Sequence, residues 1–247
     1  MMKTNKDFDS IMRCLSIDPK GIVYLPKDKA YLEFLLTFFP TLQPAKKRPD
    51  AYSIKGDTVL LLEHFEFDNS KTTRKGSEQK IKEANTQRYL DKNPYHSTML
   101  QEYVEKTGAH YVKSLETVFL SHSNNIENYK KEINAETSAS FNNYIMGFVI
   151  EDASSFGSSY YNKTNGAYTR ANMLYTKEFL DLFEKNPQLD FVIFSITKGQ
   201  DNGSFFISRN TIDDYRKKQI EVAKIEHFLF EDEICMGVTL ILPLKKR

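Results

Sequence analysis

Two acidic residues lie where a predicted β-hairpin would place them side by side. Asp50 begins a strand that follows Arg48-Pro49, and Glu63 lies part-way along the next strand, after the apolar run 59–62. A tight turn at 55–57 is predicted to join the two strands. The twelve residues between the acids are used by two strand lengths and a turn, so we expect the two carboxylates to approach each other at one end of a sheet.

A close pair of carboxylates needs something that offsets the repulsion between the two negative charges. Two negative charges about 4 Å apart repel by roughly 4 kcal/mol at an effective dielectric constant of 20. A divalent cation, a basic side chain or protonation of one acid could each relieve that repulsion. Mg²⁺ or Mn²⁺ held by two or three carboxylates positions and activates water and neutralises charge on a phosphate, which is the chemistry of phosphodiester hydrolysis.

The pattern Pro49-Asp50, a hairpin, and an apolar strand ending in Glu63-His64-Phe65 resembles that of the PD-(D/E)XK nuclease superfamily. The resemblance implies the restriction-endonuclease-like fold, an α/β architecture with a central mixed β-sheet flanked by helices. It also implies Mg²⁺ or Mn²⁺ as cofactor, with Asp50 and Glu63 as metal ligands. Glu33, on the helix expected before the hairpin, would be a further metal ligand.

Phe65 stands where the superfamily has a lysine, which orients or activates water and stabilises charge in the transition state. Three arrangements could compensate. The lysine could come from elsewhere, with Lys71 and Lys80 as candidates; Glu66 or His64 could act as a base or metal ligand; or the protein could be an inactive binder that keeps the fold.

Strand alternation separates the acidic residues that follow the apolar run. Successive side chains of a strand point to opposite faces of the sheet. Glu63 and Phe65 are therefore expected on one face, with His64, Glu66 and Asp68 on the other. A direct partnership of Glu63 with Glu66 would need a bulge or the end of the strand.

The leading functional hypothesis is metal-dependent hydrolysis of nucleic acid, with DNA favoured over RNA and with Asp50, Glu63, Glu66 and His64 as catalytic residues. Basic residues after the hairpin are predicted to contact the phosphates, namely Lys71, Arg74, Lys75 and Lys80. The alternative is a catalytically inactive nuclease-fold protein that binds nucleic acid or another protein. The superfamily suggests a role in defence or in a mobile element, and the oligomeric state stays open.

Periodicity and capping predict the elements that position these residues. Residues 95–138 are expected to form a helical insertion or layer, while 69–76 and 154–161 are expected to be loops, the former mobile. Glu151-Asp152 end a predicted buried strand and offer a second wall for a site at the sheet edge. The expected helices cover 7–16, 29–40, 78–92, 171–185 and 212–230, and the expected further strands cover 144–150, 191–196, 205–208 and 236–242.

Length and composition favour one intracellular α/β domain. The chain has 247 residues, and its 34 Lys and Arg residues balance 33 Asp and Glu residues, so nucleic acid would have to be bound by a local patch. No apolar run approaches the roughly 20 residues of a membrane-spanning helix. The beginning of the chain lacks an apolar signal segment, and the two cysteines lie far apart, so we expect a cytosolic protein.

Overall fold

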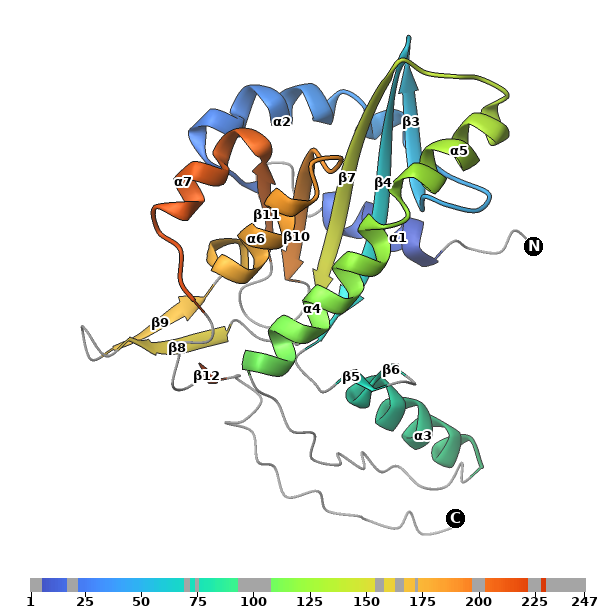
Figure 1. The fold of residues 1–247 in the computed structure, drawn as a ribbon. Helices are drawn as coiled ribbons and strands as arrows, with labels where there is room; N and C mark the ends of the chain where they lie inside the picture. Colours follow the sequence, from blue (N-terminus) through green and yellow to red (C-terminus); the bar gives the residue numbers. More distant parts are fainter. Residues whose placement is uncertain are drawn as a thin grey trace.

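A seven-stranded mixed β-sheet forms the centre of the protein, with helices on both faces (Figure 1). The computed structural model describes residues 6–16, 22–68, 72–73, 76–92, 108–153, 158–162, 167–171, 173–196, 203–221 and 228–229. Strands β4, β7 and β10 run parallel to one another. Strand β3 runs antiparallel to β4, and β11 runs antiparallel to β10. The predicted α/β class with a mixed sheet is confirmed. The spatial order is β1 (Ile22–Val23), β11 (Gly203–Ser208), β10 (Phe191–Ile196), β7 (Asn143–Asp152), β4 (Thr58–Phe67), β3 (Ala51–Lys55) and β2 (Gln43–Pro44).

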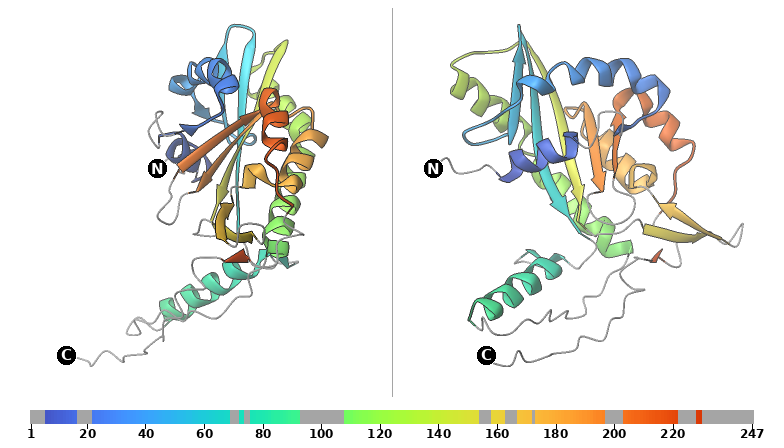
Figure 2. Two further views of the ribbon diagram at one scale, coloured as in Figure 1. Left: turned by 90° about the vertical axis from the view of Figure 1, so that its left-hand side faces the viewer. Right: turned by 180° about the vertical axis from the view of Figure 1, so that it is seen from behind.

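Two helical layers enclose this sheet, as the edge-on view shows (Figure 2, left). Helices α1 (Lys6–Ser16) and α2 (Lys29–Leu36) cover one face and share an apolar core with it. The other face is covered by α4 (Gly108–Ser123), α5 (Ile126–Thr137), α6 (Lys177–Lys185) and α7 (Ile212–Arg216). Short 3₁₀ turns η2 (Pro26–Asp28), η3 (Phe39–Thr41), η4 (Met173–Tyr175) and η5 (Arg209–Thr211) connect these elements. Among the described residues, no helix is both long and apolar enough to cross a membrane.

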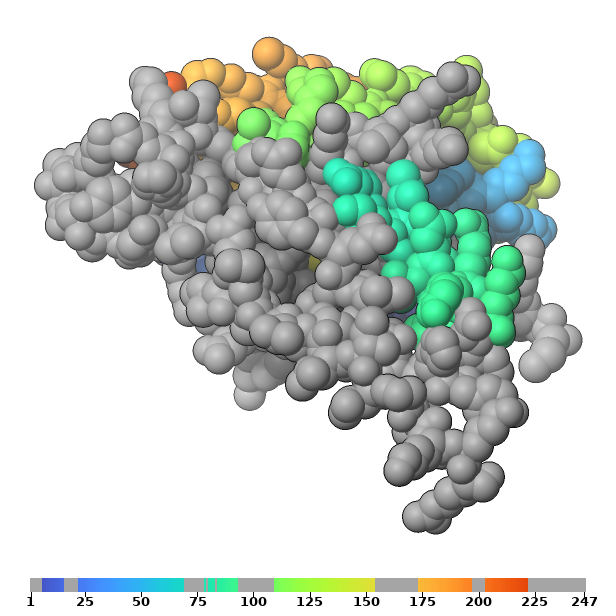
Figure 3. Space-filling model, turned by 90° about the horizontal axis from the view of Figure 1, so that it is seen from below, coloured from blue at the N-terminus to red at the C-terminus, as the bar shows by residue number. Residues whose placement is uncertain are grey.

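Smaller elements lie beyond the carboxyl end of β4. Helix α3 (Glu78–Lys92) follows a hairpin of β5 (Thr72–Thr73) and β6 (Gly76–Ser77), and it lies below α4 in Figure 1. Figure 3 shows the same region from below, with α3 in teal. A second sheet contains β12 (Phe228–Leu229), β8 (Ser158–Asn162) and β9 (Ala167–Ala171).

Strand β4 explains why an apolar run precedes the acids. It lies between β3 and β7, and all four residues of the run 59–62 are fully buried. Leu61 packs toward α4 and α5, whereas Leu60 and Leu62 pack toward α1 and α2. The turn before β4 contains Gly56 with a φ of 58°, a left-handed conformation that glycine adopts without a Cβ clash. The predicted hairpin is confirmed, and it carries Glu63 into the interior.

Several sequence-based boundaries were wrong. The predicted helix 29–40 ends at Leu36, before the 3₁₀ turn that contains Pro40. The predicted helix 171–185 begins only at Lys177, because the side chain of Thr176 accepts the Phe179 amide and caps it. The predicted loops at 154–161 and 69–76 contain β8 and the β5–β6 hairpin instead.

The predicted helix 212–230 was also too long. Helix α7 ends at Arg216, because the chain then pairs with the start of α6. The Ile220 amide donates to the Tyr175 carbonyl, and the Ile220 carbonyl accepts the Lys177 amide. A helix cannot continue through a residue whose backbone is paired in this way. Of the helical insertion or layer predicted over 95–138, α4 and α5 form the described part, and 95–107 lie outside the described residues. The strand predicted over 236–242 also lies outside them.

Gly147 provides a test of the packing between β7 and β10. It lies opposite Phe191 in the parallel ladder, and a Cβ at this position would come within 2.2 Å of the Phe191 ring. We predict that Gly147→Ala lowers the free energy of unfolding by about 1–3 kcal/mol, the usual cost of overpacking. Urea denaturation measures this loss. In a Phe191→Leu background the loss should be smaller, and an equal loss in both backgrounds would contradict the proposed clash.

Candidate functional site

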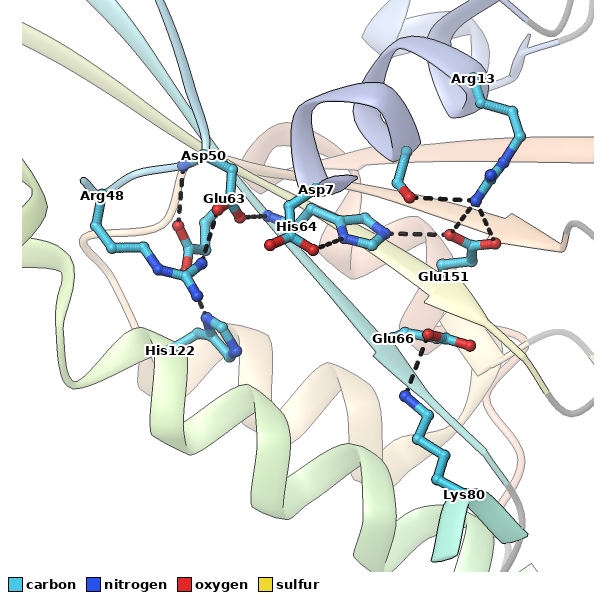
Figure 4. A network of polar contacts seen from close by, with 11 residues as sticks. Asp7, Arg13, Arg48, Asp50, Glu63, His64, Glu66, Lys80, His122 and Glu151 are labelled. Carbon is cyan, nitrogen blue, oxygen red and sulfur yellow. Dashed lines mark hydrogen bonds and ion pairs between the residues drawn. The ribbon is translucent and has the colours of Figure 1, made fainter. Parts of the chain in front are cut away.

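The hairpin brings Asp50 and Glu63 together at the end of the β3–β4 ladder. Ala51 is paired with Leu62, so Asp50 and Glu63 form the next facing pair. Both acids are buried. A single nitrogen, Nη1 of Arg48, donates to Asp50 Oδ1 at 2.8 Å and to Glu63 Oε1 at 2.7 Å (Figure 4). The two oxygens therefore converge on one point, where they share the positive charge of Arg48.

Backbone amides hold the other oxygen of each carboxylate. Asp50 Oδ2 accepts the His64 amide at 2.9 Å, and Glu63 Oε2 accepts the Asp50 amide at 3.2 Å. These bonds fix both carboxylates on rigid strands. Of the three ways of offsetting the repulsion that the sequence left open, the structure shows two: the basic side chain of Arg48 and a raised pKa of Asp50.

Two helices on the same face complete the surroundings of Glu63. His122 of α4 places Nδ1 2.7 Å from Glu63 Oε1, and the Tyr129 hydroxyl of α5 donates to that oxygen at 3.0 Å. Burial, together with the Glu63 charge, raises the pKa of Tyr129, so its hydroxyl stays protonated and can donate. Glu63 is thus oriented by groups that come from both the sheet and the helical layer.

The electrostatic state of Asp50 is unusual for an aspartate. Burial and the neighbouring Glu63 charge raise the pKa of Asp50 to about 7. The His64 amide and Arg48 act in the opposite direction but do not cancel the effect. Loss of that proton above pH 7 leaves the two carboxylates and Arg48 with one net negative charge, which a cation would offset.

Phe65, at the position of the superfamily lysine, is a core residue. Its ring stacks on the His122 imidazole with a centroid distance of 4.8 Å and an interplanar angle of 18°, and it also meets Phe119 and Phe148 edge-on. Phe65 therefore supports His122 against Glu63 and supplies no charge to the site.

The side chain of His64 points to the opposite face of the sheet. Its Nε2 lies 3.1 Å from Glu151 Oε2, and its Nδ1 lies 3.5 Å from Asp7 Oδ1 of α1. Arg13 of α1 binds Glu151 at 2.8 Å. These contacts join α1 to the sheet (Figure 4). Only the backbone of His64 reaches the Asp50–Glu63 pair, and its side chain lies on the other face of the sheet, as strand alternation predicted.

Glu66 also lies away from the carboxylate pair. It follows the same strand alternation as His64, and β4 continues without a bulge through its pairing with β7. Its carboxylate binds Lys80 of α3 at 3.1 Å. Lys80 is therefore near the end of β4, where it is paired with an acid on the face of the sheet opposite to Glu63.

The remaining predicted residues have different outcomes. Glu33 is exposed on α2, 3.9 Å from Lys29. Helix α2 covers the face of the sheet opposite to α4 and α5, which contact Glu63, so the structure does not bring Glu33 together with the hairpin acids. Asp152 accepts a hydrogen bond from the Tyr111 hydroxyl at 2.5 Å in the core. Three of the predicted phosphate contacts, Lys71, Arg74 and Lys75, lie outside the described residues.

The two carboxylates could supply part of the ligands of a divalent cation that prefers oxygen, such as Mg²⁺. In the described part of the chain, no three His, Cys, Asp or Glu side chains are arranged to hold a metal ion. Mg²⁺, however, is commonly bound through one or two carboxylates, with water and substrate phosphate as its other ligands. Asp50 and Glu63 fit that role, provided that Arg48 leaves the point where their oxygens converge.

No protein-family model, curated protein sequence or solved structure matches the chain. A functional hypothesis therefore rests on the site itself. Its defining features are a buried pair of carboxylates with converging oxygens, a half-exposed guanidinium between them, and a histidine and a tyrosine behind Glu63.

Three residues of this site were missed by sequence reasoning. Arg48 had a usable signal, because it belongs to the basic run 46–48 that lies directly before Asp50 in sequence. His122 and Tyr129 had none, because they come from helices distant in sequence from the hairpin and have no ligand spacing.

Proposed function

We propose that the protein is a metal-dependent nuclease of the restriction-endonuclease-like type, which hydrolyses phosphodiester bonds in nucleic acid, with DNA favoured over RNA. Asp50 and Glu63 would hold Mg²⁺ or Mn²⁺. The observation that carries the proposal is the convergence of one oxygen from each of these buried acids on a single point. The mixed sheet flanked by helices, with both acids on its central hairpin, supports the proposed fold type.

The chain's own residues have distinct parts in this proposal. The His64 and Asp50 amides fix the carboxylates, and His122 and Tyr129 orient Glu63. A bound cation would supply an activated water and neutralise charge on the phosphate. Lys80, at the end of β4, would contact the nucleic-acid backbone, together with Lys71, Arg74 and Lys75.

A second candidate function follows from Phe65. Its ring is buried and stacked, so the site lacks a lysine there, and Arg48 already offsets part of the charge of the acids. A catalytically inactive protein of the same fold that binds nucleic acid or another protein would have these features. Binding without hydrolysis is its distinguishing property.

A cleavage assay separates the two candidates. The purified protein is incubated with single-stranded, duplex and branched DNA and with RNA, in Mn²⁺, Mg²⁺ or EDTA. We expect cleavage that requires the metal and disappears in EDTA. Binding of a substrate that is never cleaved would contradict the nuclease and favour the second candidate. Absence of both binding and cleavage would contradict a role on nucleic acid.

A further inference from the structure

Arg48 occupies the position that a cation would need. Its Nη1 lies 2.8 Å from Asp50 Oδ1 and 2.7 Å from Glu63 Oε1. Mg²⁺ requires oxygen ligands at about 2.0–2.1 Å, so an ion bound by both oxygens would take the bridging place that Nη1 now has. The guanidinium and a metal ion cannot both be there.

Arg48 is also the member of the cluster that is able to leave. Its side chain is 46% exposed, whereas those of Asp50 and Glu63 are 4% and 0% exposed. The acids are fixed by strand amides, and Glu63 is fixed also by α4 and α5. Arginine is protonated at all ordinary pH values. Rotation of Arg48 toward solvent would place this charge in water, where it is hydrated. The same rotation would leave the two carboxylates in place.

We propose that Arg48 is the internal counter-charge of the metal-free site and that a divalent cation binds by displacing it. This inference rests on the proposed metal-binding function of Asp50 and Glu63. It adds a mechanism of regulation: the affinity of the site is set by competition between the guanidinium and the ion. Metal binding then shifts Arg48 from the interior of the cluster to the surface beside it.

Removal of the competitor gives a direct prediction. A hydrogen bond to a charged group is worth enough that its loss shifts an equilibrium roughly 10- to 100-fold. We therefore expect Arg48→Ala and Arg48→Gln to bind Mn²⁺ about 10- to 100-fold more tightly than the unmodified protein, measured by isothermal titration calorimetry. Lys47→Ala is the matched control, because Lys47 is a neighbouring cation that pairs with Glu132 of α5 instead. Its Mn²⁺ affinity should stay unchanged.

A second measurement needs no variant. Phenylglyoxal modifies accessible arginine side chains, and mass spectrometry can quantify the reaction at Arg48 in the unmodified protein. Addition of Mn²⁺ should raise the rate of modification at Arg48, with Arg216, which is paired with Asp181 and Glu184, as an internal reference.

The outcomes distinguish this inference from the proposed function. Equal Mn²⁺ affinity in the unmodified protein and in Arg48→Ala, or modification of Arg48 that Mn²⁺ does not change, would overturn the displacement while leaving the metal site standing. Failure of both the unmodified protein and Arg48→Ala to bind Mn²⁺ would overturn the proposed metal site, and the displacement with it.

Discussion

Asp50→Asn and Glu63→Gln should each lower metal-dependent cleavage by about 100-fold or more. Each substitution keeps the shape of the side chain but removes the negative charge that the cation requires. Loss of about 3 kcal/mol of transition-state stabilisation corresponds to roughly a hundredfold in rate. Both side chains are buried and point at the same position, so we expect the two substitutions to have similar effects. Single-turnover cleavage in Mn²⁺ measures the loss.

Glu33→Gln is the control for this prediction. It is the same kind of substitution on an acid that the superfamily pattern proposed as a ligand but that the structure places on exposed α2, near Lys29. Its rate should stay within about twofold of the unmodified protein, because surface substitutions of this kind change little. A loss in Glu33→Gln as large as that in Glu63→Gln would contradict the two-carboxylate site.

The second large effect concerns stability and pH. The pKa of Asp50 is about 7 in the folded protein, compared with about 3.9 in an unfolded chain. Between these values the folded state binds more protons than the unfolded state. The stability contributed by this proton is therefore complete below about pH 4 and is lost as the pH rises through 7. Asn cannot titrate, so Asp50→Asn should gain stability relative to the unmodified protein as the pH rises.

The size of the gain follows from the same pKa. Between pH 5 and pH 8 we expect the difference in unfolding free energy to move by roughly 2–3 kcal/mol in favour of Asp50→Asn. Urea denaturation at both pH values measures it. Asp214→Asn is the matched control: hydrogen bonds from Lys217 and Lys27 lower the pKa of Asp214 to about 2, so its effect should be the same at both. A difference for Asp50→Asn that does not vary with pH would contradict the shifted pKa.

These two predictions together express a conflict between function and stability. The carboxylate that is proposed to bind the cation is the one whose ionisation the metal-free fold opposes. Such conflicts are expected at functional sites. A variant that is more stable and less active is therefore the combined result we expect for Asp50→Asn.

The hairpin could be predicted because its information is local. Alternation and a glycine turn define β3 and β4, and the antiparallel register then places Asp50 opposite Glu63. The apolar run before Glu63 correctly indicated a strand buried on both faces. Strands β10 and β11 and helix α3 were found for similar reasons.

Other parts depend on contacts between distant segments. His122 and Tyr129 reach Glu63 only because α4 and α5 pack on the same face of the sheet as Glu63 and Phe65. The end of α7 depends on pairing between Ile220 and residues before α6. Neither effect has a signature in the nearby sequence. Periodicity alone therefore predicted a helix over 212–230 that was too long, and it gave no reason to choose His122 as a site residue.

The account depends most directly on whether Asp50 and Glu63 bind a divalent cation. The measurement is calorimetric titration with Mn²⁺ at about pH 8, above the Asp50 pKa of about 7, on the unmodified protein and on a variant carrying both Asp50→Asn and Glu63→Gln. We predict saturable binding to the unmodified protein and its loss in the double variant. Equal Mn²⁺ binding by the two proteins, or no binding by either, would contradict the proposed site.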